Sequence, residues 1–283
     1  MALRICTGAY RTSPVESLYV DSGIPPLSIH REELGLRYLS RVLTSKLNPN
    51  YKYVKQPTDR APTRPRLPKP LEVRLMDSAN QISLLPPAVA EIRPPKYPPW
   101  VTPNIRICAA GYDKKTCSDE QLKSSILEHA SEHANSISIY TDGSKSPAGV
   151  GCSVVAPDSV IKKKLPANST VFTAELLAVL TALKYIFFSN QSSISFTIFT
   201  DSMSILASLR KFSPSHQLVQ EILDWFYLLV YRKGMEILFC WVPAHVGIIG
   251  NERADSAAKA ATRLSHVSNM SIPVCDFNPL TIR

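Results

Sequence analysis

The chain has 283 residues, which is enough for one large domain or two modest ones. Hydrophobic residues make up 45% of it, so a packed core is expected. The formal net charge of +9 suits a polyanionic partner, although ordinary surface basicity would give the same value. Of this charge, +6 falls on residues 1–135 (19 Lys and Arg against 13 Asp and Glu) and +3 on residues 136–283 (13 against 10).

Six scattered cysteines form no C-x-x-C pair, which argues against a zinc ribbon and against a dense disulfide framework. The first residues, Met1–Gly8, lack the apolar segment of a secretory signal. The longest apolar run, Trp225–Tyr231, is too short to span a bilayer. We therefore expect an intracellular protein without a membrane partner, in either the cytoplasm or the nucleus.

The first half of the chain contains three predicted segments. Residues 1–56 have helical patterning, and residues 57–117 are interpreted as a proline-rich basic linker. Because 12 of the 23 prolines lie within residues 57–103, that stretch is predicted to hold no regular helix or central strand. Residues 118–135 predict one polar helix. It carries an H-x-x-E-H pattern at His129–His133, which we interpret as a solvated surface because no third metal ligand follows.

Residues 136–265 predict a single α/β domain, followed by a C-terminal tail over residues 266–283. Strands come first and then alternate with helices, so we expect a mixed five-stranded sheet with helices on both faces. The predicted strands are 137–142, 150–156, 160–165, 194–200 and 237–242, and the predicted helices are 172–188, 202–209, 218–231 and 251–264.

Four acidic residues stand at strand ends and helix starts within this domain. Asp142 and Asp201 each close an apolar run, while Glu175 and Asp255 lie where helices are predicted to begin. Singly, each has an ordinary structural explanation as a turn residue, a helix cap or a first-turn acid. Jointly they indicate a site, because ligands of open α/β sheets gather at the carboxyl ends of strands.

A cluster of carboxylates favours hard cations, which take oxygen ligands. Two such cations about 4 Å apart can activate a water and stabilise a leaving oxygen, as phosphodiester hydrolysis requires. We therefore predict a site for two Mg²⁺ ions, with Mn²⁺ as a possible substitute. Asp142, Glu175 and Asp201 are predicted to hold the metals, and Asp255 to complete the coordination of the second.

Residues 136–265, which contain these four acids, resemble the type 1 ribonuclease H domain of non-LTR retrotransposons. The last matching block is the most specific, because it places His245 ten residues before the fourth acid across a loop that contains Gly247. Residues 1–56 resemble, less specifically, the end of the reverse transcriptase region that precedes such a domain. The matching blocks are Tyr140-Thr141-Asp142-Gly143-Ser144, Ala174-Glu175-Leu176, Thr200-Asp201-Ser202 and Trp241 to Asp255.

The resemblance implies a ribonuclease H-like fold and hydrolysis of the RNA strand of RNA–DNA hybrids. Its implied partners are the hybrid and the remainder of a reverse transcriptase polyprotein. His245 has a side chain suited to proton transfer near neutral pH, or it is a surface loop residue. Asn251 either contacts nucleic acid or caps the last helix. Backbone groups at Gly143 and Ser144 are candidates for sensing the 2′-hydroxyl.

Two other functions remain open at this point. The chain could be a catalytically idle nucleic-acid-binding remnant, although all four acids and His245 are intact. It could also be a different nuclease or a strand-transfer enzyme on the same fold, which the segment Asn251–Asp255 disfavours. Residues 1–110 could supply affinity for the hybrid or be a passive remnant of a larger protein.

Overall fold

The computed structural model describes residues 2–55, 69–81, 89–91, 93–108, 120–121, 124, 135–189, 195–211 and 216–276. The chain divides into two compact units, with unit 1 ending at Glu91 and unit 2 spanning Ile92–Asp276. The predicted polar helix over residues 118–135, with its His129–His133 pattern, lies almost wholly outside the described residues.

Unit 1 is helical, as residues 1–56 predict. Its small core gathers Leu36, Leu39 and Val42 of one helix with Leu75 and Ala79 of another. The second of these helices corrects the prediction that residues 57–103 hold no regular helix. The described prolines of that stretch, among them Pro70 and Pro94, lie outside this helix, where proline is tolerated. The helices are α1 (Ala2–Thr7), α2 (Val15–Ser22), α3 (Leu27–Leu43), α4 (Tyr51–Lys55) and α5 (Leu71–Gln81).

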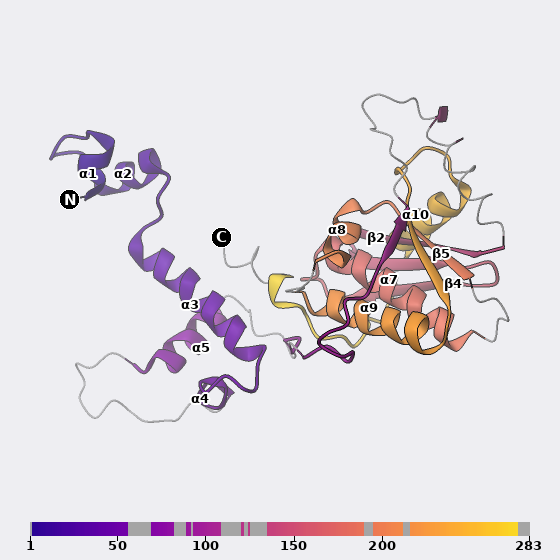
Figure 1. Cartoon of the computed structure of the whole chain (residues 1–283). Helices are drawn as coiled ribbons and strands as arrows, with labels where there is room; N and C mark the ends of the chain where they lie inside the picture. Colours follow the sequence, from indigo (N-terminus) through magenta and orange to yellow (C-terminus); the bar gives the residue numbers. More distant parts are fainter. Residues whose placement is uncertain are drawn as a thin grey trace. The chain divides into compact units, whose positions relative to one another are not determined.

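Unit 2 is built on one mixed sheet with the strand order β1-β6-β5-β2-β3-β4 (Figure 1). Strands β2, β3 and β4 form an antiparallel meander, and β2, β5, β6 and β1 run parallel. The sheet has six strands, so the prediction of five is wrong by one. The strands are β1 (Arg106–Cys108), β2 (Ile137–Ser146), β3 (Gly149–Val155), β4 (Val160–Leu165), β5 (Ser195–Thr200) and β6 (Glu236–Trp241).

The extra strand, β1, comes from the segment that the sequence assigns to the linker. It pairs with the outer edge of β6, where a short strand preceded by prolines is allowed. Ile105 is buried in the main core, and the ring of Tyr97 lies 5.7 Å from that of Tyr227. A strand of three residues is too short to show alternation, so the pattern could not reveal it.

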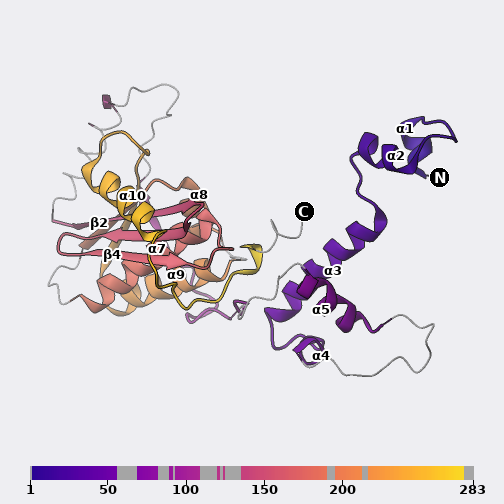
Figure 2. The same ribbon diagram turned by 180° about the vertical axis from the view of Figure 1, so that it is seen from behind.

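Helices cover both faces of the sheet. Helices α7 (Val171–Phe188) and α9 (Gln217–Tyr227) pack together over one face, and α10 (Ile249–Ala261) crosses the other (Figures 1 and 2). A short helix α8 (Met203–Leu209) follows β5, and a π-helix η1 (Leu228–Arg232) extends α9. Helix α7 is long and apolar enough to cross a membrane, but 67% of that stretch is buried inside the protein, as expected of a core helix.

Glycines allow the helices to approach the central strands closely. A Cβ atom added to Gly143 of β2 would lie 2.6 Å from the backbone nitrogen of Glu175 in α7. On the other face, a Cβ atom added to Gly151 of β3 would lie 2.6 Å from the nitrogen of Thr262, just past α10. These contacts set both helices against the strands that carry the candidate site.

The stability of shortened chains tests the assignment of residues 92–108 to unit 2. A fragment of residues 92–276 keeps every strand of the sheet, whereas a fragment of residues 130–283 loses β1 and exposes the edge of β6. We expect the fragment of residues 130–283 to be less stable by at least about 2 kcal/mol, since it lacks the buried side chains of Ile105 and Tyr97. Urea unfolding measures this difference, and equal midpoints would show that residues 92–108 are only a linker.

Candidate active site

Three of the four predicted acids meet in one cluster. Asp142 lies on the central strand β2, Glu175 on α7, and Asp201 directly after β5. One carboxylate oxygen of each lies within 4.8 Å of the others. Parallel pairing of β2 with β5 brings Asp142 and Asp201 to the same end of the sheet. Helix α7, which packs on β2, supplies Glu175.

The positions of these acids do not fit their ordinary structural explanations. The N-cap of α8 is Ser202, so Asp201 does not occupy the cap position. Glu175 is the fifth residue of α7 and is only 6% exposed, and so it is not a solvated first-turn acid. Asp142 is also 6% exposed and lies within a strand, which continues to Ser146. Burial of charged groups in this way is costly unless a function or a ligand offsets it.

Burial raises the pKa of all three carboxylates, and repulsion from neighbouring acids adds to the shift. Burial raises the pKa of Glu175 to about 9, with further contributions from Asp142 and Asp201. The pKa of Asp142 rises to about 7 for the same reasons, with Asp201 and Asp255 as its charged neighbours. Burial likewise raises the pKa of Asp201. The backbone N–H of Gly143 opposes the shift at Asp142 and Glu175 by hydrogen bonding.

This donor set fits a divalent cation. The Oε2 atom of Glu175 is buried, and none of the described residues supplies it with a hydrogen-bond partner. The cluster offers only carboxylate oxygens, the ligands that Mg²⁺ and Mn²⁺ prefer. A bound cation would favour the charged form of each acid and so counter the penalty that raises their pKa values.

Asp255 lies near this cluster but is not part of it. It is the seventh residue of α10, and its Oδ2 accepts a hydrogen bond of 2.7 Å from Lys259 one turn later. Its charge nevertheless contributes to the raised pKa values of Asp142 and Asp201. Its place on α10 is set by Ser153 of β3, whose hydroxyl donates to the carbonyl of Ala254 at 2.7 Å.

Asn251 is a positioning group that the sequence left undecided. It is the third residue of α10, whose N-cap is Ile248, so its interpretation as a helix cap is wrong. Its side chain is 4% exposed and hydrogen-bonds to Asp201, which lowers the pKa of that acid. The preceding Gly250 lets this turn approach β2, since a Cβ atom there would lie 2.2 Å from the ring of Tyr140.

His245 lies on the exposed loop between β6 and α10. It is the only non-glycine residue with positive φ among the described residues, at 62°. Such a conformation is strained for a residue with a Cβ atom and is often found at functional sites. The charge of His245 lowers the pKa of Asp201, so the imidazole acts electrostatically on the acidic cluster.

Sequence reasoning missed two groups that hold the site in place. The indole Nε1 of Trp241, at the end of β6, donates to the carbonyl oxygen of Asp201 at 3.0 Å. Lys259 forms an ion pair with Asp255. The spacing of four residues on one helix is the sequence signal that could have indicated this pair. Of the predicted substrate contacts, Gly143 has its N–H directed to the carboxylates, while Ser144 is partly exposed on the same strand.

The comparisons with known proteins match the segment of the chain that contains β2 to β6 and α10. The RNase H family model matches residues 134–263, so this segment is an RNase H domain. The Pol polyprotein of Equine infectious anemia virus (strain Wyoming) is 31% identical over 133 residues, which are 45% of this chain. The chain spans only 11% of the length of that relative. Among solved structures, LC11-RNase H1, isolated from compost by a metagenomic approach, is similar with 21% identity and a TM-score of 0.37, over 45% of this chain and 96% of that one.

Proposed function

We propose that the chain hydrolyses the RNA strand of RNA–DNA hybrids in a reaction that depends on divalent metal ions. The observation that carries this proposal is the buried cluster of Asp142, Glu175 and Asp201 within an RNase H domain. Buried carboxylates that repel one another are unfavourable in an apo protein, and a cation site is the function that explains their retention.

Three residues would hold the metal ions. Asp142 on the central strand β2 would hold them together with Glu175 and Asp201, and Asp255 would complete the coordination of the second ion after leaving Lys259. Bound ions would supply a nucleophilic water and stabilise the leaving oxygen. The carboxylates orient the phosphate by fixing where these ions bind, and Asn251 keeps Asp201 in place through its hydrogen bond.

His245 would move a proton as the product leaves. Its position on an exposed loop, its electrostatic effect on Asp201 and its strained backbone support this role. For the choice of RNA, Ser144 is the better of the two proposed contacts with the 2′-hydroxyl, because the N–H of Gly143 already serves the carboxylates.

We expect His245→Ala to slow cleavage by on the order of 10²–10⁴-fold while some activity remains, as for other residues that transfer protons. His245→Gly should lose a similar amount of activity but be more stable than His245→Ala, since glycine relieves the strain of a positive φ. Ile249→Ala, an exposed change near the same loop, is the matched control. Activity of His245→Ala equal to wild type would remove the residue from the mechanism.

We further propose that the chain belongs to a retroelement polyprotein of the non-LTR type. The similarity to a retroviral Pol polyprotein supports a retroelement context, and the helical unit 1 agrees with the resemblance of residues 1–56 to the end of a reverse transcriptase region. The remainder of that polyprotein would then be a partner, together with the hybrid.

A substrate comparison tests the proposed function. Purified full-length chain is incubated with a hybrid, duplex DNA or duplex RNA, each labelled on one strand, in Mg²⁺, Mn²⁺ or EDTA. We expect cleavage only of the RNA strand of the hybrid, and only with metal. Binding of the hybrid without cleavage would support the idle nucleic-acid-binding remnant, and equal cutting of duplex DNA would support a different nuclease.

A further inference from the structure

Residues 264–276, here called the C-terminal clasp, lie beyond the segment that matches the RNase H family model. The sequence predicts a tail from residue 266, but this part of the chain packs onto unit 2. Ser268 N–H donates to the carbonyl of Lys164 on the edge strand β4 at 2.7 Å. Ile272 and Asp276 are only 5% and 1% exposed. The clasp is therefore a folded part of unit 2.

The clasp ends against the first turn of α7. The Oδ1 atom of Asp276 accepts hydrogen bonds of 2.8 Å from the hydroxyls of Thr170 and Thr173. Thr170 is the N-cap of α7, and its own oxygen accepts from the N–H of Thr173. A buried carboxylate here also complements the positive end of the helix dipole. Asp276 thus joins the cap and the first turn of the helix that carries Glu175.

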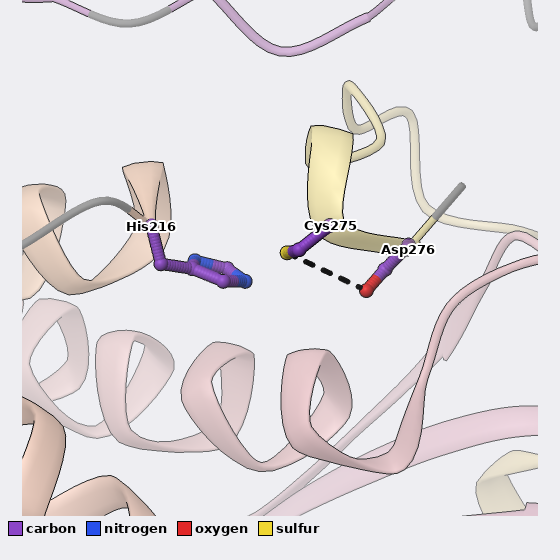
Figure 3. Close-up of side chains that lie close together, drawn as sticks. All are labelled: His216, Cys275 and Asp276. Atoms are coloured by element: carbon purple, nitrogen blue, oxygen red, sulfur yellow. Dashed lines mark hydrogen bonds between the residues drawn. The ribbon is translucent and has the colours of Figure 1, made fainter. Parts of the chain in front are cut away.

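His216, at the start of α9, lies beside Cys275 and Asp276 (Figure 3). Its Nδ1 accepts a hydrogen bond from the N–H of Leu218, so the proton of the neutral ring is placed on Nε2. Nε2 of His216 and Oδ2 of Asp276 are both buried, and neither has a hydrogen-bond partner among the described residues. A buried donor and a buried acceptor in one cluster are complementary, so a hydrogen bond between them would join α9 to the same carboxylate.

The same three side chains, His216, Cys275 and Asp276, have the spacing of a metal site, with one ligand atom of each within 4.8 Å of the others. Zinc would bind His216 through a lone pair on Nε2. Because Nδ1 accepts the hydrogen bond from Leu218, the neutral ring carries its proton on Nε2 and has no free lone pair there. The geometry therefore favours a hydrogen-bonded link over a zinc centre.

We propose that the C-terminal clasp positions Glu175 for metal binding by fixing the first turn of α7, with Asp276 as the positioning residue. Glu175 follows Thr173 by two residues in a rigid helix, so a shift of that turn displaces the carboxylate from Asp142 and Asp201. This inference rests on the proposed function, because it assigns the clasp to the same metal cluster.

The test measures how the melting temperature of the full chain depends on Mg²⁺ concentration, a readout separate from cleavage. Residues that hold a metal ligand directly change affinity by roughly 10–100-fold, so for Asp276→Ala we expect the half-saturating Mg²⁺ concentration to rise on the order of 3–10-fold. Asp276→Asn keeps an oxygen for the two threonine hydroxyls and should restore most of the affinity.

Two further variants separate positioning from general stability. Thr173→Val removes the hydroxyl at the same contact, so its effect should not add to that of Asp276→Ala. Ile186→Val, a buried change at the far end of α7, should lower the melting temperature without changing the Mg²⁺ concentration required.

The outcomes are distinguishable. Loss of stability in Asp276→Ala with an unchanged Mg²⁺ requirement would overturn the positioning role. If stoichiometric Zn²⁺ stabilised the wild type but not Cys275→Ser, the three side chains would form a zinc centre, and the proposed positioning role would be overturned. If Mg²⁺ did not change the melting temperature of the wild type, both the positioning role of the clasp and the metal site would be overturned. Absence of hybrid cleavage with an intact Mg²⁺ response would count against the proposed function alone.

Discussion

Asp201→Asn is expected to reduce cleavage of the hybrid by more than about 10⁴-fold, beyond the loss from a single proton-transfer group. The change keeps the size of the side chain and an oxygen that can face Asn251, but it removes one of three clustered charges. The same charge raises the pKa of Asp142 and Glu175. The metal-free variant should therefore be more stable than the wild type near pH 8.

Rates on a labelled hybrid in Mg²⁺ and urea unfolding in EDTA measure the two effects together. Glu252→Gln is the matched control, because it neutralises a carboxylate in the first turn of α10 while keeping an acceptor for the N–H of Gly247. Its activity and stability should stay close to those of the wild type. If Asp201→Asn instead lowered the metal-free stability, Asp201 would be mainly a structural residue.

The second large effect is a loss of metal-free stability as the pH rises. Asp142 and Glu175 have raised pKa values of about 7 and about 9 in the folded chain, against 3.8 and 4.5 as reference values. Their contribution is thus fully present below pH 4 and is lost as pH rises through 7 to 9, because deprotonation favours the unfolded chain. The free energy of unfolding in EDTA should fall between pH 5 and pH 9 by several kcal/mol, as an order of magnitude.

Two comparisons attribute this pH dependence to the cluster. Glu175→Gln cannot ionise and should flatten the dependence in EDTA. Saturating Mg²⁺ should restore stability most at pH 9, where the carboxylates are ionised and available as ligands. A wild-type curve that is flat from pH 5 to pH 9, or that rises, would mean that these carboxylates are not held close together without metal.

The sequence was sufficient for the architecture and for the three acids that meet in the cluster, because both leave strong local patterns. Strand ends at Asp142 and Asp201 follow from apolar runs, and parallel strands of one sheet present their carboxyl ends together. The buried helix that carries Glu175 has a pattern long enough to be unambiguous. The prediction of five strands was wrong because β1 is too short to form any pattern.

Other features depend on contacts between distant residues and left no local signal. Nothing near Asp276 indicates that its carboxylate accepts hydrogen bonds from Thr170 and Thr173, more than 100 residues earlier. The role of Asn251 depended on where α10 begins, which patterns place only within a few residues. The strained backbone of His245 likewise follows from the loop geometry and not from its sequence.

The chemical ends of the cleaved strand test the central claim most directly. A DNA strand with a short internal RNA tract is paired with DNA, labelled, and incubated with wild type or Asp201→Asn in Mg²⁺ or EDTA. Attack by water with the 3′-oxygen as leaving group leaves a 5′-phosphate and a 3′-hydroxyl, whereas attack by the 2′-hydroxyl leaves a cyclic phosphate. We predict 5′-phosphate ends within the RNA tract, only in Mg²⁺ and only with the wild type. Cyclic phosphate ends, or cleavage that persists in EDTA or in Asp201→Asn, would contradict a metal-dependent site built on Asp142, Glu175 and Asp201.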